Sequence, residues 1–285
     1  MINRNNNAYR LPTRHILKVI KKLATSKKKM YKNFLFNFKT DISSIDIPSE
    51  LNNPFSTHIP EIAKEAAKEF QEFITLESKK WNYDFSIQRG KMFGILVLQK
   101  QDHTYSYIGT VSGKLPENAK CDKFIPSVFD ESTDDFFINK GMIGLSEISN
   151  KIKRANHPSE IILLKEKRKQ KSVALQKQLF ENYHFLNLSG KEKNLLEIFK
   201  YSAHGNPPAA TGECAAPKLL QYAIKHQLKP IALTEFWWGS SSENKEKKHR
   251  AYYPACKNRC RPILEYMLED TELFTKKEAE TKAKE

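Results

Sequence analysis

Residues 59–74 carry apolar side chains on one side of a predicted helix. The apolar positions recur three or four residues apart, at Ile59, Ile62, Ala63, Ala66, Ala67, Phe70, Phe73 and Ile74. Residues 92–98 are almost wholly apolar, as expected of a central strand, and residues 105–111 predict the strand that returns beside it. The first half of the chain therefore predicts a helix followed by two paired strands.

The pattern becomes strongly charged between residues 143 and 203. Residues 160–183 are free of glycine and repeat apolar positions every three or four residues, which predicts a long helix. A second helix is predicted over residues 189–203, with Ser189 as its N-cap and Glu192 three residues later. Two such helices predict a helical hairpin or coiled-coil arm, whose cations face either solvent or RNA.

The last third of the chain returns to an α/β pattern. A helix is predicted over residues 216–227, with Pro217 in its first turn, and a strand over residues 228–239. A last helix is predicted over residues 252–270, interrupted at Pro262. Together these elements predict an α/β fold, a mixed sheet with flanking helices, to which the inserted arm is added.

Composition divides the chain into five predicted regions. They are a basic N-terminal arm at residues 1–45, a helix and β-hairpin part of the α/β domain at 46–142, the helical insertion at 143–203, a cysteine-bearing helix–strand–helix at 204–270, and a charged tail at 271–285. We therefore expect the α/β domain to form from two segments that the helical insertion separates in the sequence.

The charge of the chain indicates a polyanionic partner. The formal net charge is +15, and the first 40 residues contain 11 Lys and Arg but no Asp or Glu. These cations, among them Lys27, Lys28 and Lys29, form either a solvated tail or an arm that neutralises RNA phosphates. No apolar run approaches the roughly 18 residues of a membrane span, and no signal-peptide core follows Met1, so we expect a cytoplasmic protein without a membrane partner.

Four cysteines offer the main candidate chemistry. Cys121, Cys214, Cys256 and Cys260 are too few for the disulfide framework of a secreted protein. They are therefore buried thiols, metal ligands or nucleophiles. Cys121 lies in a predicted loop and is assigned no role.

Six blocks between residues 50 and 270 resemble the N-terminal region of long RluA-type pseudouridine synthases. The blocks are NPFSTHIPEIAKEAAKEFQ, GKMFGILVL, VSGKL, FIPSVFD, ECAAPKLLQYAIKHQLKPIALTEFWWG and YYPACKNRCRPILEYML. Those enzymes isomerise uridines in transfer and ribosomal RNA, and a separate catalytic domain carries their nucleophilic aspartate in a His-Arg-Leu-Asp motif. Here the only His-Arg pair, His249-Arg250, continues as Ala251-Tyr252. We therefore expect no pseudouridine synthase activity from this chain alone.

This resemblance implies an RNA-associated accessory protein. It would position structured RNA (tRNA or rRNA), or dock onto a separate pseudouridine synthase or the ribosome. A protein–protein scaffold built on the helical insertion is an alternative. The side chains expected to contact RNA, each of which has surface charge or core packing as its alternative role, are Lys27, Lys28, Lys29, Lys218, Trp237, Trp238, Arg250, Lys257, Arg259 and Arg261.

Trp237 and Trp238 are adjacent in a predicted strand. Successive side chains of a strand point to opposite faces, so one indole is expected to face the core and the other solvent or a partner. An indole exposed to solvent would be a candidate stacking surface for a base.

The predicted order of elements is also similar to that of zinc-dependent nucleobase deaminases. This resemblance implies that Cys214 is the first zinc ligand, that Cys256 and Cys260 are a second pair, and that His204 is a weaker candidate for a fourth ligand. A spacing of four residues still places the paired sulfurs on one face of a helix. The alternative is that Cys214 and Cys256 are buried thiols without a metal.

The position of the acid in this pattern departs from the deaminases. Their catalytic glutamate follows the first ligand by two residues, where this chain has Ala216. Glu213 precedes the cysteine instead, and is either a site residue or a cap of the helix. A deaminase-like enzyme is therefore a second alternative to the accessory protein, and whether the chain is an enzyme stays open.

Overall fold

The computed structural model describes residues 34–269, apart from residues 82, 88, 116–118, 120, 130, 203–204 and 242–245. The predicted RNA contacts Lys27, Lys28 and Lys29 and the predicted ligand His204 lie outside the described residues.

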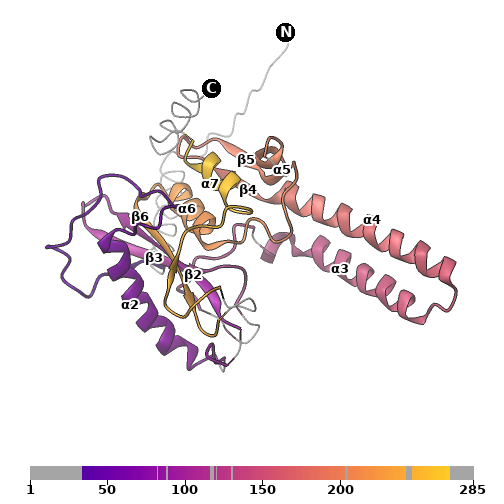
Figure 1. Ribbon diagram of the computed structural model, residues 1–285. Coiled ribbons are helices and arrows are strands. Elements are labelled where there is room, and N and C mark those ends of the chain that lie inside the picture. The colour runs from indigo at the N-terminus through magenta and orange to yellow at the C-terminus, as the bar shows by residue number, and fades with distance from the viewer. Residues whose placement is uncertain are drawn as a thin grey trace, which may run out of the picture.

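A five-stranded sheet forms the centre of the molecule (Figure 1). Its strand order is β1-β3-β2-β6-β7, and each neighbouring pair is antiparallel. The strands are β1 (Phe36–Asn37), β2 (Lys91–Gln99), β3 (Tyr105–Val111), β6 (Lys229–Trp238) and β7 (Tyr252–Tyr253). The predicted α/β fold, a sheet with flanking helices, is confirmed.

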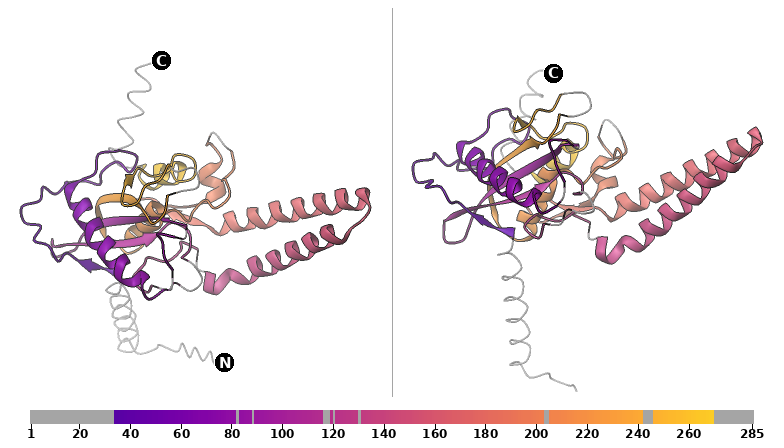
Figure 2. Two further views of the ribbon diagram at one scale, coloured as in Figure 1. Left: turned by 60° about the horizontal axis from the view of Figure 1, so that its bottom comes forward. Right: turned by 90° about the horizontal axis from the view of Figure 1, so that it is seen from below.

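Helices cover both faces of this sheet (Figure 2). On one face α2 (Glu61–Ser78) packs against alternate residues of β2 that begin at Phe93. On the other face α6 (Ala215–Lys225) and α7 (Arg261–Met267) share a core with the intervening residues of β2, such as Leu96. Because β2 is covered on both sides, it is apolar throughout rather than alternating.

A helical hairpin arm is present, but it begins before residue 143 and ends before residue 203, so its bounds differ from the predicted insertion. It consists of α3 (Glu131–Arg154) and α4 (Pro158–Asn182), which lie side by side and project away from the sheet (Figures 1 and 2). Gly141 and Gly144 of α3 face α4: a Cβ at Gly141 would collide with the Leu175 side chain, and a Cβ at Gly144 would meet only the movable end of Lys171. Gly141 therefore allows the two helices to approach closely.

The predicted second helix over residues 189–203 is wrong. The chain there forms the two-stranded sheet of β4 (His184–Leu186) and β5 (Glu192–Asn194), followed by the short helix α5 (Leu195–Phe199). The partner of α4 in the arm is α3 instead, whose first residues carry no clear apolar repeat in the sequence.

Local hydrogen bonds explain why the helix starts later than predicted. Asn194, not Ser189, is the N-cap of α5: its side chain accepts from the Glu197 N–H at 3.0 Å, and the Glu197 carboxylate accepts from the Asn194 N–H at 2.8 Å. The Ser189 hydroxyl donates to the side chain of Asn187, and Gly190 turns the chain with a φ of +80°. Ser189 and Asn194 both match the capping-box pattern, but the turn at Gly190 places Ser189 in the β4–β5 hairpin, so Asn194 is the N-cap.

The last predicted helix is shorter than the sequence indicates. Residues 252–253 form β7, and α7 begins only at Arg261, with Pro262 in its first turn. Pro262 therefore starts a helix rather than interrupting one. Among the residues that the structure describes, every helix is too short or too polar to cross a membrane.

Candidate metal centre

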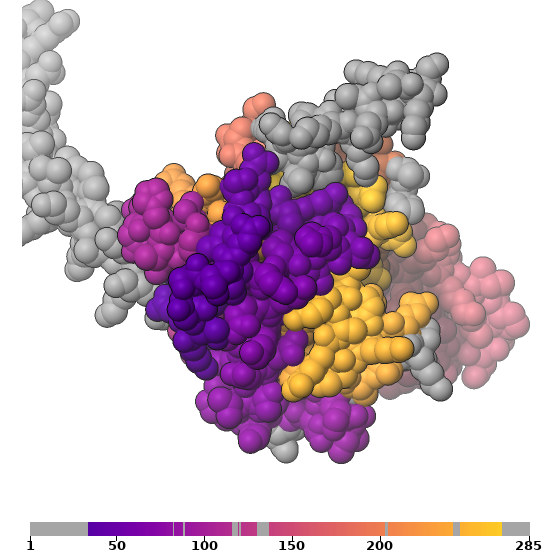
Figure 3. Space-filling view, turned by 60° about the vertical axis from the view of Figure 1, so that its left-hand side comes forward, coloured from indigo at the N-terminus to yellow at the C-terminus, as the bar shows by residue number. Residues whose placement is uncertain are grey.

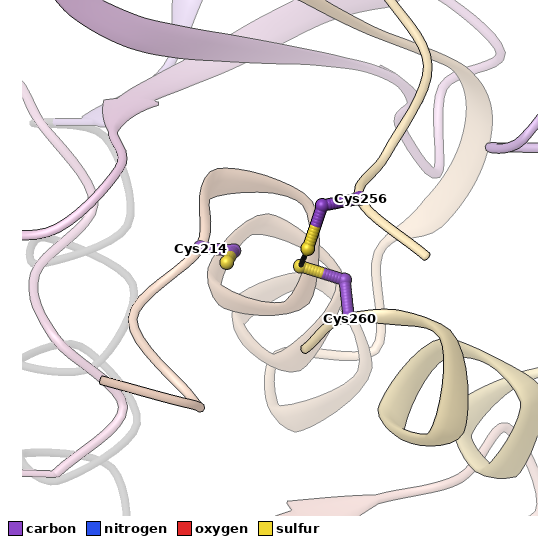
Figure 4. A group of neighbouring side chains, drawn as sticks. All are labelled: Cys214, Cys256 and Cys260. Atoms are coloured by element: carbon purple, nitrogen blue, oxygen red, sulfur yellow. Dashed lines mark hydrogen bonds between the residues drawn. The ribbon is translucent and has the colours of Figure 1, made fainter. Parts of the chain in front are cut away.

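Three of the four cysteines meet between the starts of α6 and α7. Cys214 immediately precedes α6, Cys260 immediately precedes α7, and Cys256 lies just after β7. Their sulfur atoms all lie within 4.8 Å of one another, and the Cys256 and Cys260 sulfurs are 3.2 Å apart. Figure 4 shows these two side chains pointing toward each other, with Cys214 beside them. The fourth, Cys121, packs against the core on the α2 side of the sheet.

The paired cysteines do not lie on one helix as predicted. A turn over residues 257–260 separates Cys256 from α7, and this turn rather than a helical face brings the two sulfurs together. The segment that carries Cys256 and Cys260 is anchored just before Cys256, because the Ala255 N–H donates to the Pro54 carbonyl at 2.9 Å. Figure 3 shows the corresponding N-terminal and C-terminal segments side by side on one face of the molecule.

A glycine in β2 allows the start of α6 to approach the sheet. Gly94 pairs with Glu235 of β6, and a Cβ at Gly94 would lie 2.7 Å from the Cβ of Ala215. That distance is shorter than any normal contact between carbon atoms, so a larger residue would push the start of α6 outward. Gly94 therefore determines where Cys214, the residue before Ala215, can lie.

The donor set of this cluster fits a zinc ion. Zinc binds cysteine sulfur at about 2.3 Å in a tetrahedral arrangement, which puts neighbouring sulfurs about 3.8 Å apart. The Cys256 and Cys260 sulfurs are 3.2 Å apart and no pair in the cluster is separated by more than 4.8 Å, so the sulfurs are close to the spacing that zinc requires. Small side-chain rotations would therefore be enough to bind the ion, and Cys214, Cys256 and Cys260 would hold it.

The three thiols share their protons unequally. Hydrogen bonds from the Cys214 and Cys260 thiols lower the pKa of Cys256, and backbone N–H groups after it act in the same direction. The hydrogen bond to Cys256 raises the pKa of Cys214, and the hydrogen bond to Cys214 raises the pKa of Cys260. The cluster therefore favours one thiolate at Cys256, the form of cysteine that binds metals.

A buried carboxylate that sequence reasoning missed lies near these thiols. Glu235 of β6 is 5% exposed, and its Oε1 accepts a hydrogen bond from the Ala216 N–H at 3.1 Å. Burial raises the pKa of Glu235 to about 7, an effect that the Ala216 hydrogen bond opposes and the Cys256 charge reinforces. The positive charge of Lys247 acts in the opposite direction and lowers the pKa of Glu235. Burial in turn lowers the pKa of Lys247.

The sequence carried only a weak signal for Glu235. In "IALTEFWW" it is the single ionisable residue in a run that is otherwise apolar apart from Thr234. A charged side chain inside a central strand is rarely buried without a partner, so its presence could have suggested a site.

Glu213, the predicted acid, lies in a different network. Its carboxylate accepts hydrogen bonds from the Tyr183 hydroxyl at 2.6 Å and the Ser127 hydroxyl at 2.8 Å, and its Oε2 lies 3.7 Å from the Lys218 ammonium. The N-cap of α6 is Cys214 rather than Glu213, and these contacts of the Glu213 carboxylate are with side chains rather than with the N–H groups of the first turn. Glu213 thus connects α6 to the base of the arm rather than to the cysteines.

Lys218, a predicted RNA contact, is an internal residue. Its side chain is 2% exposed, and the ammonium donates to the Gly113 carbonyl at 3.1 Å in addition to its contact with Glu213. An ammonium held in this way does not present its charge to a phosphate at the surface.

Both tryptophans are buried, so the prediction of one exposed indole is wrong. Trp237 is 9% and Trp238 is 6% exposed. The Trp237 indole N–H donates to the Ser240 carbonyl at 2.6 Å, and the Trp238 ring packs against the His249 ring and the Arg250 guanidinium. The loop after β6 folds back over both rings, which strand alternation alone could not indicate.

Two of the predicted RNA contacts line one pocket. Trp238 and Arg250 border a cavity of about 880 Å³ together with His249, Lys79 and Tyr83. Arg250 has a φ of +64°, an unusual conformation for a residue other than glycine.

The remaining predicted cations surround the cysteine turn. Lys257 and Arg259 are exposed between Cys256 and Cys260. Arg261 is partly buried, with its guanidinium over the Phe55 ring and 3.7 Å from a Glu265 oxygen. Lys257 and Arg259 therefore present positive charge beside the candidate metal centre.

Comparison of this chain with family models, with curated proteins and with solved structures gives no match.

Proposed function

We propose that this chain binds zinc through Cys214, Cys256 and Cys260 and is a hydrolytic zinc domain of the nucleobase-deaminase type that acts on RNA. One observation carries the proposal, the approach of three sulfur atoms from two distant segments to within 4.8 Å. A zinc ion held there would supply Lewis-acid activation of a water molecule. Three protein ligands are the pattern of catalytic zinc sites, since structural sites close the fourth position with a further ligand.

The order of the elements supports this proposal. The helix α2 and the strands β2 and β3 come first, and the cysteine-bearing α6, the strand β6 and the cysteine-bearing α7 follow after the arm. Cys214 and Cys260 immediately precede these two helices, and Cys256, the thiol whose pKa is lowered, lies in the segment before α7. This order is compatible with the deaminase-type arrangement that the proposal assumes.

The charge of the chain supports RNA as the substrate. The net charge of +15 favours a polyanion, and Lys257 and Arg259 lie exposed between two of the cysteines. These cations would hold phosphates of a strand whose base enters the centre. RNA would bind through its backbone, while the centre itself would recognise one base.

The first test is the metal content of the full-length chain. We expect about one zinc per chain when the protein is purified without chelator, measured by elemental mass spectrometry. Cys214→Ser, Cys256→Ser and Cys260→Ser should each lose most of that zinc, because two remaining thiolates hold the ion much more weakly. Cys121→Ser is the matched control, since Cys121 packs on the opposite side of the sheet, and it should keep its zinc.

A zinc-free protein whose three clustered thiols all react with a thiol reagent would refute the metal centre. Equal zinc loss in the Cys121→Ser control would also refute it, because the loss would then reflect general destabilisation.

A second candidate function is the RNA-associated accessory role without catalysis, favoured by the same net charge. In that role the chain would position transfer or ribosomal RNA for a separate enzyme. Chelation distinguishes the two functions: RNA binding that survives complete zinc removal, in a chain that releases no ammonia from RNA when loaded, supports the accessory role.

A further inference from the structure

Glu235 occupies a place in the core where an apolar side chain would be more stable. It lies within a buried strand, with Leu233 before it and Trp237 after it on the same face, and is itself 5% exposed. Burial of a carboxylate costs free energy unless partners compensate for it. The described residues show one hydrogen bond to this carboxylate, from the Ala216 N–H. A position that is costly for folding suggests a role in function.

The carboxylate of Glu235 is fixed at the helix terminus that carries Cys214. Ala216 is the second residue of α6 and Cys214 is the residue before the helix. The first N–H groups of a helix have no partner within it, and Oε1 of Glu235 accepts one of them at 3.1 Å. The acid and the first candidate ligand are therefore held by the same turn of backbone.

We infer that Glu235 is the proton-transfer residue of the centre, and that it replaces from β6 the glutamate that is missing at position 216. The inference rests on the proposed zinc-dependent function. Its substrate would be an RNA base that carries an exocyclic amino group, either cytosine or adenine. Glu213 is excluded from this role because Tyr183, Ser127 and Lys218 engage its carboxylate elsewhere.

Glu235 transfers two protons in this reaction. It accepts one proton from the attacking water, whose oxygen bonds to the amino-bearing ring carbon, and passes it to the adjacent ring nitrogen. It then takes the remaining hydroxyl proton and gives it to the amino group as the carbon–nitrogen bond breaks. One water is consumed, one ammonia leaves, the base keeps a carbonyl, and the carboxylate is regenerated without any change in oxidation state.

The decisive variant is Glu235→Gln in the full-length chain. An amide oxygen can still accept the hydrogen bond from Ala216, so the start of α6 keeps its anchor while proton transfer is lost. The probes are oligoribonucleotides that contain cytosine and adenine, and the readouts are released ammonia and the mass of the product. We expect deamination to fall at least about 100-fold.

Glu69→Gln is the matched control. Glu69 is also a buried carboxylate, 4% exposed, but it lies on α2 and accepts from the Lys39 and Thr40 N–H groups and the Tyr107 hydroxyl. We expect it to lower the melting temperature and to leave deamination per folded molecule unchanged. Glu235→Gln should show the opposite pattern, with full zinc content and a melting temperature that is unchanged or higher.

A spectroscopic readout separates a catalytic role from a structural one. With Co²⁺ in place of zinc, the visible bands report the surroundings of the metal. We expect them to shift in Glu235→Gln and to stay unchanged in Glu69→Gln.

The outcomes distinguish this inference from the proposed function. A wild-type chain without zinc overturns the metal centre and the inference with it. A zinc-loaded chain that deaminates equally well with Gln at position 235 overturns the role of Glu235 and leaves the proposed function standing. A zinc-loaded wild-type chain that deaminates neither base overturns both the deaminase function and the role of Glu235, and leaves only the metal centre.

Discussion

Glu235 illustrates how burial changes the chemistry of a single side chain. Its pKa is raised to about 7, chiefly by burial, from an ordinary value of 4.5. At pH values between 4.5 and about 7, Glu235 has already lost its proton in the unfolded chain but still holds it in the folded chain. The folded state therefore binds more protons, and its stability falls as the pH rises through this interval.

The first prediction concerns this pH dependence. In the metal-free chain, Glu235→Gln should have the same free energy of unfolding as the wild type below pH 4.5. Above pH 7 the variant should be more stable by about 2–3 kcal/mol, because the amide has no charge to bury. Urea denaturation with a chelator present, at several pH values, measures this difference.

The exposed Glu72 provides the control for this measurement, since Glu72→Gln should change stability little at any pH. A stability difference at position 235 that is the same at pH 4 and pH 8 would contradict the assignment of a raised pKa.

At the scale of elements, the contact between β2 and α6 sets the position of the candidate centre. Glu235 on β6, Gly94 on β2 and Ala215 on α6 lie within one cross-section of the molecule. Helix α6 packs on the neighbouring strands β2 and β6, and Cys214 lies at the N-terminal end of α6. A change in the spacing of these layers should therefore affect both stability and metal binding.

The second prediction is that Gly94→Ala damages both properties. The added methyl would lie 2.7 Å from the Ala215 Cβ and 3.1 Å from Leu219, so α6 must move. We expect a loss of stability of about 1–3 kcal/mol and weaker zinc binding. Denaturation and competition with a zinc-binding dye measure the two effects.

Gly113→Asn is a suitable control, because no atom lies within 4 Å of a Cβ at that position and asparagine tolerates its φ of +71°. Unchanged zinc affinity in Gly94→Ala would show that α6 does not control the position of Cys214.

The elements also show where sequence patterns were sufficient. The apolar faces of α2, β2 and β6 depend on residues that are close in the sequence, and these elements were predicted correctly. The start of α5 was not, because Ser189 and Asn194 both precede a glutamate by three residues. Only the turn at Gly190 and the packing of Leu195 and Phe199 into the core decide between them.

At the scale of the whole molecule, positive charge is the property most relevant to a partner. The basic segment predicted at residues 1–45 ends in residues that belong to the body: β1 pairs with β3, Phe36 stacks on Tyr107, and Glu69 holds the Lys39 and Thr40 N–H groups. A truncation that tests the charge should therefore end before residue 34.

The third prediction concerns salt. Affinity for transfer RNA should fall steeply as salt rises, with a log–log slope of roughly 0.7–0.9 per phosphate neutralised. Removal of residues 1–33 should flatten that slope while the fold is kept. Fluorescence anisotropy at several salt concentrations measures it.

A variant that changes Lys27, Lys28 and Lys29 to Gln keeps the length of the chain and separates charge from bulk; it should flatten the slope partly. A slope that neither variant changes would exclude the N-terminal cations from RNA binding.

The amino-acid pattern alone was enough to predict α2, β2, β3, α4, α6 and β6, the excess of positive charge and the candidate metal ligands. These properties depend on periodicity and composition, which are local or simply additive along the chain. Cys214, Cys256 and Cys260 could be named in advance because the resemblance to zinc deaminases implies those positions as ligands.

Which side chains share a site depends on how distant segments pack together, and the pattern of the chain does not show this. In the folded chain Glu235 lies at the start of the helix that follows Cys214, and both tryptophans are buried. Lys218 and Glu213 form an ion pair with each other. The physical reason is that burial and pKa depend on which segments pack together across the sheet, and residues distant in the sequence, such as Gly94 and Ala215, control that packing.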